Sequence, residues 1–531
     1  MPSRTFHQAE AETPPTEDPM THVLGRVVLA MTLLFFLSTA IALWRIPSWA
    51  LASLTPDDAF YYFKIARNFV QGYGFSFDTI NPTNGFQPLW MYLLLLPAYF
   101  TREMDVEVFP RVGILYQYVL LLAATLLLYQ ALRKWCPLAI LLLSSAIVIL
   151  LGLRVFVNGM ETIVVFLVFA TNVWYLSRQE LGSLTAGHFA VVGVLAALVF
   201  LSRLDSVFAM LIWMLLQAVL VKQNRLPWSY LLYMVVAAGA LAAPYLLYNW
   251  VAFGDWMPIS GRLKNSFPRI EQIDWGRVPT EHLLALTALS TALWWLWRRT
   301  PQQRLLMLFL LAWLLGSGVH TLHTILFMKW AVFKWHFSSY WMPLAVLLPL
   351  LLTQFQRTRW RRLAYAAGTI LWLTLAVSLV LFVRETVPTK GLPTWARATY
   401  QAARWTRQHT PPHAVLAMKD AGRFGYYSDR RVINLDGLVN NMQLQEQIRA
   451  GKLRQYLQDR GVRFLVQHAI TPDSQMVEDA PAVTAGTYRR TRIFYLSQLY
   501  NVYSEGIPLY RDDERFRTRH RGGVFLIWAL R

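Results

Sequence analysis

The sequence predicts a polytopic α-helical membrane protein with a small α/β domain at its carboxyl-terminal end. Hydrophobic residues make up 55% of the 531 residues and charged residues only 15%, which is too apolar for an ordinary soluble domain. The apolar residues fall into runs long enough to cross a bilayer, with short basic clusters between them. After residue 384 these runs give way to alternating helix-like and strand-like patterns, which predict the α/β domain.

Eleven apolar runs are each expected to form one membrane span. They cover residues 24–44, 110–131, 137–153, 160–178, 187–202, 206–221, 228–250, 281–298, 305–327, 339–356 and 362–384. A crossing helix requires about 20 residues, and the run 89–100 is shorter and contains Pro97. We therefore expect that run to lie at the membrane interface, as one of the interfacial helices. Residues 1–23 are expected to form a flexible cytoplasmic tail.

The distribution of Lys and Arg predicts the orientation of these spans. Basic clusters at 221–225, 297–304 and 357–362 fall on one side of the membrane, which the positive-inside rule assigns to the cytoplasm. The loop 46–88 and the domain 385–531 are then expected outside. The clusters account for the formal net charge of +20, and no zinc-finger or helix-turn-helix spacing accompanies them, so a nucleic-acid partner is excluded. The single cysteine, Cys136, excludes an internal disulfide.

The external loop 46–88 carries two adjacent carboxylates, Asp57 and Asp58, directly after the first span. Adjacent carboxylates repel each other, and nearby lipid makes that repulsion more costly. Such a pair indicates proton, metal or substrate chemistry. We expect Asp57 and Asp58 to be catalytic and the loop to form the active site of a membrane enzyme.

Further polar residues are expected on the same external face. Lys and Arg form charge-assisted hydrogen bonds with phosphate oxygens, so basic groups there suit an anionic lipid headgroup. The candidates for binding the donor phosphate are Arg262, Lys264, Lys329, Lys334 and His336. The candidates for contact with a sugar or an acceptor are Tyr61, Tyr62, Asn84, Gln87, Glu161, Arg203 and Asp205.

Structural roles are the alternative for these candidates. Arg203 and Asp205 suit an ion pair at a tight helical hairpin, and Glu161 suits a helix cap. Asn84 lies in the turn signature NPTNG. The basic residues also suit side chains that extend to the membrane surface, and the aromatic residues after Asp58 suit an amphipathic helix anchored there.

The external segments also carry a family resemblance. The first loop reads DDAFYYFKIARNFVQGYGFSFD and then NPTNGFQPLW, and later segments read NGMET, SRLD and GDWMPISGRLK. These strings resemble the GT-C superfamily of polyprenyl-phosphate-sugar-dependent membrane glycosyltransferases. The similarity is greatest to bacterial members such as arabinofuranosyltransferase-like and mannosyltransferase-like enzymes, and it spans the membrane region. The segment INLDGLVNN at 433–441 is similar to the external domain of these relatives.

The resemblance implies a GT-C-like fold in a bacterial-type cytoplasmic membrane, with the carboxyl-terminal domain extracytoplasmic. It implies transfer of a sugar from a polyprenyl-phosphate donor to an envelope glycan, lipid or protein, with inversion. The general base would be Asp57, and Asp58 would orient the acceptor. Relatives often have Asn or His where this chain has Gln87, so the role of that position does not carry over.

A divalent cation at Asp57 and Asp58 is the alternative to a metal-free mechanism, because hard cations prefer carboxylate and phosphate oxygens. No other acidic cluster in the sequence completes a coordination sphere, so no metal ligands are assigned. Two other functions are compared with the transferase: a transporter or flippase of lipid-linked sugars, and a non-catalytic envelope scaffold. A transporter typically has repeated halves and polar sites near the bilayer midplane, whereas a scaffold leaves the acidic pair unexplained.

Overall fold

The computed structural model describes residues 19–271, 273–330, 332–356, 358–387, 394–471, 510–511, 516–517 and 522–529. Most of the expected tail 1–23 lies outside these residues, and the end of it is helical because α1 begins at Pro19. The α-helices are α1 (Pro19–Arg45), α2 (Ser48–Leu54), α3 (Asp57–Asn68), α4 (Pro88–Phe100), α5 (Val108–Leu132), α6 (Leu138–Val155), α7 (Thr162–Leu176), α8 (Ala186–Ser202), α9 (Val207–Gln223), α10 (Ser229–Phe253), α11 (Ile259–Lys264), α12 (Thr280–Trp297), α13 (Arg304–Phe327), α14 (Leu344–Gln356), α15 (Arg361–Thr386), α16 (Trp395–His409), α17 (Gly422–Tyr427), α18 (Met442–Arg449) and α19 (Leu453–Asp459). The shorter helical segments are η1 (Phe69–Tyr73), η2 (Leu181–Ser183), η3 (Leu204–Ser206), η4 (Trp275–Arg277), η5 (Pro301–Gln303) and η6 (Lys334–Trp341), and the strands are β1 (Val415–Met418), β2 (Arg431–Asn434), β3 (Val462–Thr471), β4 (Tyr510–Arg511), β5 (Phe516–Arg517) and β6 (Gly522–Ala529).

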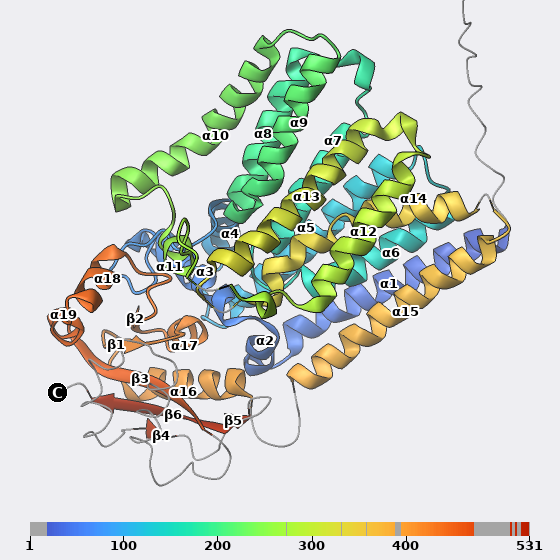
Figure 1. Cartoon of the computed structure of the whole chain (residues 1–531). Helices are drawn as coiled ribbons and strands as arrows, with labels where there is room; N and C mark the ends of the chain where they lie inside the picture. Colours follow the sequence, from blue (N-terminus) through green and yellow to red (C-terminus); the bar gives the residue numbers. More distant parts are fainter. Residues whose placement is uncertain are drawn as a thin grey trace, which may run out of the picture.

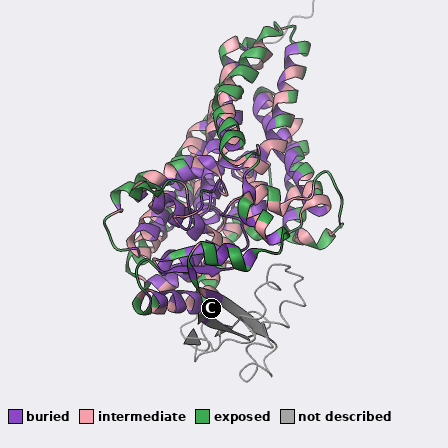
Figure 2. Cartoon of the chain, turned by 90° about the vertical axis from the view of Figure 1, so that its left-hand side faces the viewer, coloured by how far each residue is buried: buried purple, intermediate pink, exposed green. Residues whose placement is uncertain are grey.

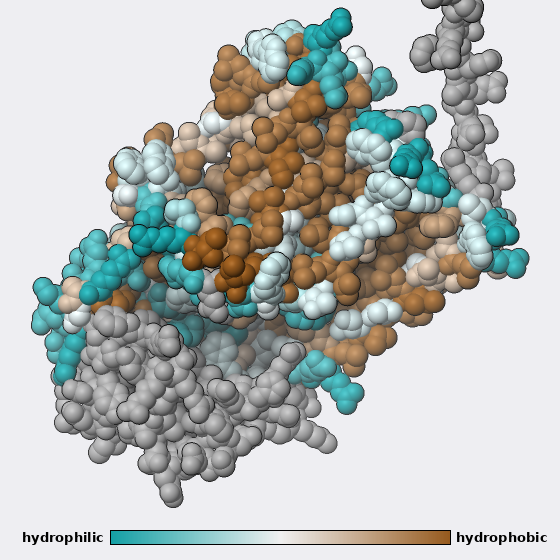
Figure 3. Space-filling model, viewed as in Figure 1, coloured by the Kyte–Doolittle hydropathy of each residue, from teal (hydrophilic) through white to brown (hydrophobic). Residues whose placement is uncertain are grey.

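Each of the eleven predicted spans coincides with an α-helix, namely α1, α5 to α10 and α12 to α15. Within the described ranges, eight helical segments are long and apolar enough to cross a membrane, while α4, α7 and α8 are apolar but shorter. Hydrophobic residues cover the middle of the helices, and hydrophilic residues gather toward their ends (Figure 3). The polytopic helical membrane protein predicted from composition is thus confirmed. The interfacial position of α4 remains a prediction.

The carboxyl-terminal segment forms the small α/β unit that the sequence predicts. The sequence predicts a helix over 394–409 and strands over 414–418, 431–435 and 463–468, and helix α16 and strands β1, β2 and β3 lie at these positions. The strand order is β2-β1-β3-β6-β4, with β5 paired to β6. Strand β1 runs parallel to β2 and β3, whereas β3 and β6 are antiparallel. Figure 1 shows this unit against one end of the helical bundle, beside α2 and α3.

Helix α3 is buried between the helical bundle and the carboxyl-terminal unit. It contacts α4, α5 and α17, and Phe60, Tyr61, Tyr62 and Phe63 are all buried. The expectation that these aromatic residues anchor a helix on the membrane surface is therefore wrong. The reason is that the carboxyl-terminal unit covers the face of α3 that would otherwise meet water or lipid. Figure 2 shows buried segments gathered in this region, with exposed residues along the helices that extend away from it.

Polar contacts attach the carboxyl-terminal unit to the bundle at the edge of this buried region. Glu107 accepts hydrogen bonds from the hydroxyls of Ser48 and Tyr400, both at 2.6 Å. Arg67 of α3 forms an ion pair with Asp429 at 2.7 Å. The contacts of Tyr400 with Glu107 and of Asp429 with Arg67 fix the orientation of the unit on the bundle, because each pairs a group of the unit with a group of the bundle.

Helices α8 and α10 pack closely at Gly193. A Cβ atom at this position would come within 3.1 Å of the Cα of Met234 and closer still to its carbonyl group. We expect Gly193→Val to destabilise the protein by about 1–3 kcal/mol, since the backbones would have to separate. The matched control is Gly239→Val in α10, where a Cβ atom meets nothing within 4 Å. The thermal unfolding midpoints of the detergent-solubilised variants test this, and equal midpoints would contradict the close packing.

Candidate active site

A cavity of about 390 Å³ lies between the helical bundle and the carboxyl-terminal unit. Segments from both parts form its wall: α3, residues 85–87 and 160–161, the hairpin from α8 to α9, the end of α10, α11, Met328, Trp335, His336 and residues 438–439. Its lining includes the apolar side chains of Phe200, Phe208 and Leu246, which come from the membrane helices α8, α9 and α10. It also includes charged and polar groups. A cavity with a mixed lining of this kind suits a ligand that has both a hydrocarbon and a polar part.

The carboxylate of Asp57 is occupied by donors from the carboxyl-terminal unit. The backbone N–H groups of Gly422 and Arg423 donate to it at 2.9 and 3.0 Å, and the Arg423 guanidinium donates at 3.3 Å. Arg423 also donates to the backbone carbonyls of Ala52 and Thr55, both at 2.9 Å. Burial raises the pKa of Asp57 to about 7, and Arg423 acts against that rise. Asp57 thus joins the first loop to α17 and is absent from the cavity lining.

The neighbouring carboxylate of Asp58 lines the cavity. Within the described part of the chain, no group donates a hydrogen bond to it. Burial raises the pKa of Asp58, the carboxylates of Asp436 and Asp420 add to the rise, and Lys264 and Arg423 oppose it. A half-buried carboxylate with vacant lone pairs and a raised pKa is suited to accept a proton from a ligand.

Arg203 organises a second group of charges on the cavity wall. It binds both carboxylate oxygens of Asp205, with its Nε at 2.8 Å from Oδ1, and lies 3.4 Å from Glu161. Glu161 also accepts from the Tyr62 hydroxyl at 3.1 Å. The expected ion pair of Arg203 with Asp205 is confirmed, whereas the expected capping role of Glu161 is wrong, because its side chain caps no N–H group of α7. The buried guanidinium of Arg203 requires a negative partner, so the Glu161 carboxylate lies against it and away from the N–H groups of α7.

Two of the five predicted phosphate ligands line the cavity, Lys264 and His336. The other three lie outside it: Arg262 pairs with Asp255, Lys329 with Glu271 and Lys334 with Glu281. Exposed pairs of this kind contribute little to stability. Among the described residues, Lys264 has no carboxylate within ion-pair distance, so its charge is available to an anionic ligand.

Of the remaining residues predicted to contact a sugar or an acceptor, some line the cavity and one does not. Tyr61, Tyr62 and Gln87 line the cavity. The Gln87 side chain accepts from the backbone N–H of Leu204 at 3.0 Å and so holds the hairpin between α8 and α9. Asn84 does not line this cavity, because its side chain donates to Asn249 at 3.2 Å and accepts from the N–H of Ile259 at 3.0 Å. It joins the turn to α10 and α11, as its turn signature favours.

Sequence reasoning did not identify the contribution of the carboxyl-terminal unit to the site. Leu438 and Val439 line the cavity, and Asp436 lies beside Asp58 and accepts from the Tyr61 hydroxyl at 3.4 Å. The only available signal was the string INLDGLVNN, which contains these three residues. Its resemblance to external domains pointed to the unit but gave no contact with the first loop.

The residues around the acidic pair do not fit a bridging divalent cation. Asp57 already accepts three N–H donors, which occupy the lone pairs that a cation would require. Within the described residues, no group of three or more His, Cys, Asp and Glu side chains is arranged to hold a metal ion. We therefore derive no step through a cation at this pair.

The different surroundings of Asp57 and Asp58 predict different effects of neutralising each on stability. Asp57→Asn places an amide N–H against donor groups, so we expect the free energy of unfolding to fall by about 1–3 kcal/mol. Asp58→Asn is the matched control and removes no partner, so its unfolding midpoint should stay near that of the wild type. Thermal unfolding in detergent at neutral pH measures both. A larger loss in Asp58→Asn would contradict the assignment of the contacts.

Comparisons with known proteins give one family match and several similar solved structures, two of which are described here. Residues 392–512 match a domain of unknown function, DUF8728, and no curated protein matches the chain. The chain is similar to archaeal oligosaccharyltransferase AglB from Archaeoglobus fulgidus in complex with an inhibitory peptide and a dolichol-phosphate, with 13% identity and a TM-score of 0.47 over 85% of this chain and 70% of that one. It is also similar to the oligosaccharyltransferase of the same organism tethered to an acceptor peptide through a disulfide, with 11% identity and a TM-score of 0.47 over 92% and 74% of the two chains. The family match lies in the segment that holds Arg423 and Asp436.

Proposed function

We propose that this protein is a GT-C-type glycosyltransferase that moves a sugar from a polyprenyl-phosphate donor to an acceptor hydroxyl. The observation that carries the proposal is the Asp58 carboxylate, which lines a cavity that has both apolar and basic residues in its wall. A general base and a phosphate-binding cation are the two groups that inverting transfer requires. The sugar is a hexosyl or pentosyl residue, and the acceptor is an envelope glycan, lipid or protein.

The general base in this proposal is Asp58, and Asp57 has a positioning role. What supports the choice is that Asp57 is bound by three N–H donors, whereas Asp58 has a free carboxylate at the cavity. A base must reach the proton it removes. Asp57 acts through Arg423, which it holds against the loop that carries Asp58. The resemblance alone favoured Asp57 because it is the first carboxylate in the motif.

The donor is proposed to bind in the cavity with its hydrocarbon chain against the apolar lining residues and its phosphate against the basic ones. Phe200, Phe208 and Leu246 would contact the first isoprene units, since they lie beside the membrane helices. Lys264 and His336 would bind the phosphate oxygens, and the positive charge of Lys264 is best placed for the charge that develops on the leaving phosphate. Arg203 is already neutralised by Asp205 and Glu161, so its proposed role is to orient the carboxylates that contact sugar hydroxyls.

The reaction follows from this arrangement. Asp58 takes the proton of the acceptor hydroxyl as the oxygen attacks the anomeric carbon of the sugar. A bond forms between that oxygen and the anomeric carbon, and the bond from the anomeric carbon to the phosphate oxygen breaks. The electron pair leaves with polyprenyl phosphate, and Lys264 compensates its charge. Attack opposite to the leaving group inverts the anomeric configuration.

The proposal also assigns the parts of the chain to the membrane. Residues 24–384 form the transmembrane catalytic domain, and residues 385–531 form an extracytoplasmic domain that completes the cavity. The basic clusters between spans support this orientation in a bacterial-type cytoplasmic membrane. Leu438 and Val439 from the outer domain would then border the acceptor, because they are the residues by which that domain lines the cavity.

Sugar transfer by the purified, lipid-reconstituted protein tests the function and the base together. A panel of polyprenyl-phosphate sugars is offered with crude envelope acceptors, and consumption of each donor is measured. We expect Asp58→Asn to lower turnover at least about 100-fold with donor binding retained, because proton removal in the transition state is lost. Asp459→Asn, at an exposed carboxylate in α19, is the control of equal charge change.

Asp57→Asn should retain measurable turnover at temperatures where it stays folded. If Asp57→Asn is inactive while Asp58→Asn is active, the general base would have to be assigned to Asp57 instead of Asp58. If the wild type consumes no donor, the proposal fails and a transporter of lipid-linked sugars or an envelope scaffold becomes the better explanation.

The raised pKa of Asp58 predicts the pH dependence of the reaction. A general base acts only when ionised, so kcat/KM should fall as the pH is lowered through the pKa of Asp58. Because burial raises that pKa, the fall should begin above the ordinary range of an aspartate, near pH 4. A rate profile from pH 4 to 9 measures it. Full activity down to about pH 4 would contradict a buried base.

A further inference from the structure

A second cavity, of about 450 Å³, lies between α1 and α15 on one flank of the helical bundle. Both helices pack against α6, and Figure 1 shows them side by side, with α2 at the end nearer the carboxyl-terminal unit. Residues of α2, α5 and α6 complete the lining of this cavity. Val380 and Val383 of α15 belong to the lining and are 55% and 43% exposed. The cavity therefore opens toward the surrounding lipid.

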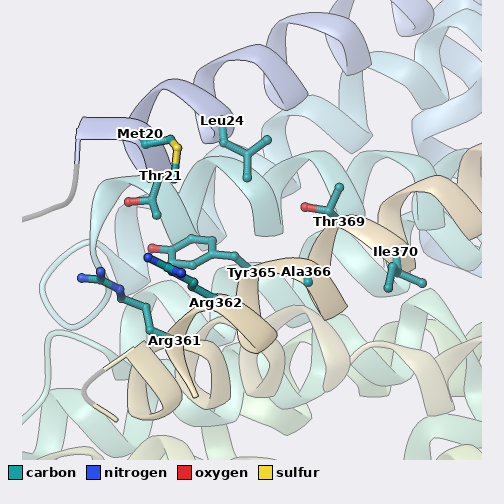
Figure 4. Close-up of a pocket in the computed structure, with 9 residues that line it drawn as sticks. All are labelled: Met20, Thr21, Leu24, Arg361, Arg362, Tyr365, Ala366, Thr369 and Ile370. Carbon is teal, nitrogen blue, oxygen red and sulfur yellow. The ribbon is translucent and has the colours of Figure 1, made fainter. Parts of the chain in front are cut away.

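The cavity extends along the helices by about the depth of one leaflet. Its lining residues on the α1 side run from Phe35 to Ile46, a rise of about 16 Å, which is close to half of the roughly 30 Å hydrocarbon core. Just before Phe35, the indole N–H of Trp372 donates to the Thr32 hydroxyl at 2.7 Å and joins α1 to α15. This contact lies between the cavity and another one at the opposite end of the same two helices (Figure 4). Most of the lining is apolar, so it matches one hydrocarbon chain that reaches the middle of the bilayer.

Three polar residues line the cavity where three elements end. Arg384 lies in the last turn of α15, Thr55 follows α2 directly, and Asn158 follows α6. These ends face the carboxyl-terminal unit, since the backbone carbonyl of Thr55 accepts a hydrogen bond from Arg423 at 2.9 Å. None of the lining residues is acidic. The polar groups thus belong to the end of the cavity where a lipid headgroup would lie.

The donor groups of these three residues are available to a ligand. The Oδ1 atom of Asn158 accepts from the backbone N–H of Met160 at 3.0 Å and from the Thr162 hydroxyl at 3.3 Å. This fixes the orientation of the amide and leaves Nδ2 as a donor. Among the residues that the structure describes, the Asn158 Nδ2, the Thr55 hydroxyl and the Arg384 guanidinium have no hydrogen-bond or ion-pair partner. A guanidinium with two neutral donors complements the oxygens of a phosphate.

We propose that this cavity binds an anionic phospholipid from the leaflet on the side of the candidate active site. The headgroup phosphate binds Arg384, Asn158 and Thr55, and one acyl chain lies between α1 and α15. A zwitterionic lipid of equal chain length binds less tightly, because its own positive group opposes Arg384. The site is separate from the candidate active site, since the two cavities share no lining residue. The inference does not depend on the proposed glycosyl transfer.

Native mass spectrometry of the detergent-solubilised protein tests the proposal. Phosphatidylglycerol and phosphatidylcholine with identical acyl chains are titrated separately, and we expect tighter binding of phosphatidylglycerol. One basic residue beside an anionic lipid is worth about fivefold in affinity. Arg384→Gln should therefore weaken phosphatidylglycerol binding about fivefold and change phosphatidylcholine binding little. The matched control is Arg269→Gln, which removes the same charge from an exposed position in the loop after α11, outside the lining.

A second pair of variants tests the cavity without changing charge. Ala42→Phe adds bulk inside the lining, whereas Ala30→Phe adds the same side chain at an exposed position of α1 outside it. We expect only Ala42→Phe to weaken phosphatidylglycerol binding, with the unfolding midpoint of the lipid-free protein unchanged in both. Equal affinity for the two lipids would overturn the proposal, because the cavity would then recognise hydrocarbon alone. Equal effects of Arg384→Gln and Arg269→Gln, or of the two alanine variants, would overturn it as well.

Discussion

The contact of Asp57 with Gly422 and Arg423 is the interaction on which the candidate site depends. It joins residues separated by 366 positions in the sequence, and through Arg423 it also reaches the carbonyls of Ala52 and Thr55. Arg423 is almost completely buried, so its positive charge requires a negative partner. Asp57 is the carboxylate that pairs with it. Without this contact the carboxyl-terminal unit would have no charged attachment to the start of α3, and the cavity beside Asp58 would lose one wall.

The two adjacent carboxylates illustrate how the protein uses one sequence feature for two purposes. Their side chains point in different directions from the first turn of α3, so one meets the carboxyl-terminal unit and the other meets the cavity. Repulsion between them is limited because Arg423 lies near both. The cost of burying each charge is met differently: Asp57 has fixed donors, whereas Asp58 has Lys264 nearby and space for a ligand.

Hydropathy and local pattern were sufficient to predict the eleven apolar helices of the bundle and the Arg203–Asp205 pair, since both depend on residues close in sequence. The strands β1 to β3 were predicted for the same reason. What could not be predicted is which face of α3 is covered and which of Lys264, Lys329 and Lys334 reaches the cavity. Those answers depend on how distant segments dock. The sequence around a basic residue near a membrane does not show whether its side chain contacts Glu271, Glu281 or a ligand.

The contact of Gly85 with residue 438 has a consequence for the relation between the two parts of the molecule. A Cβ atom at Gly85 would collide with the backbone of Leu438, so two main chains touch with no side chain between them. A surface matched at the level of the backbone tolerates few substitutions on either side. The carboxyl-terminal unit is therefore no interchangeable module: released by proteolysis, it would expose Tyr426 and Tyr427, which pack on Phe60, to water, and a unit taken from another chain would have to reproduce the same main-chain path.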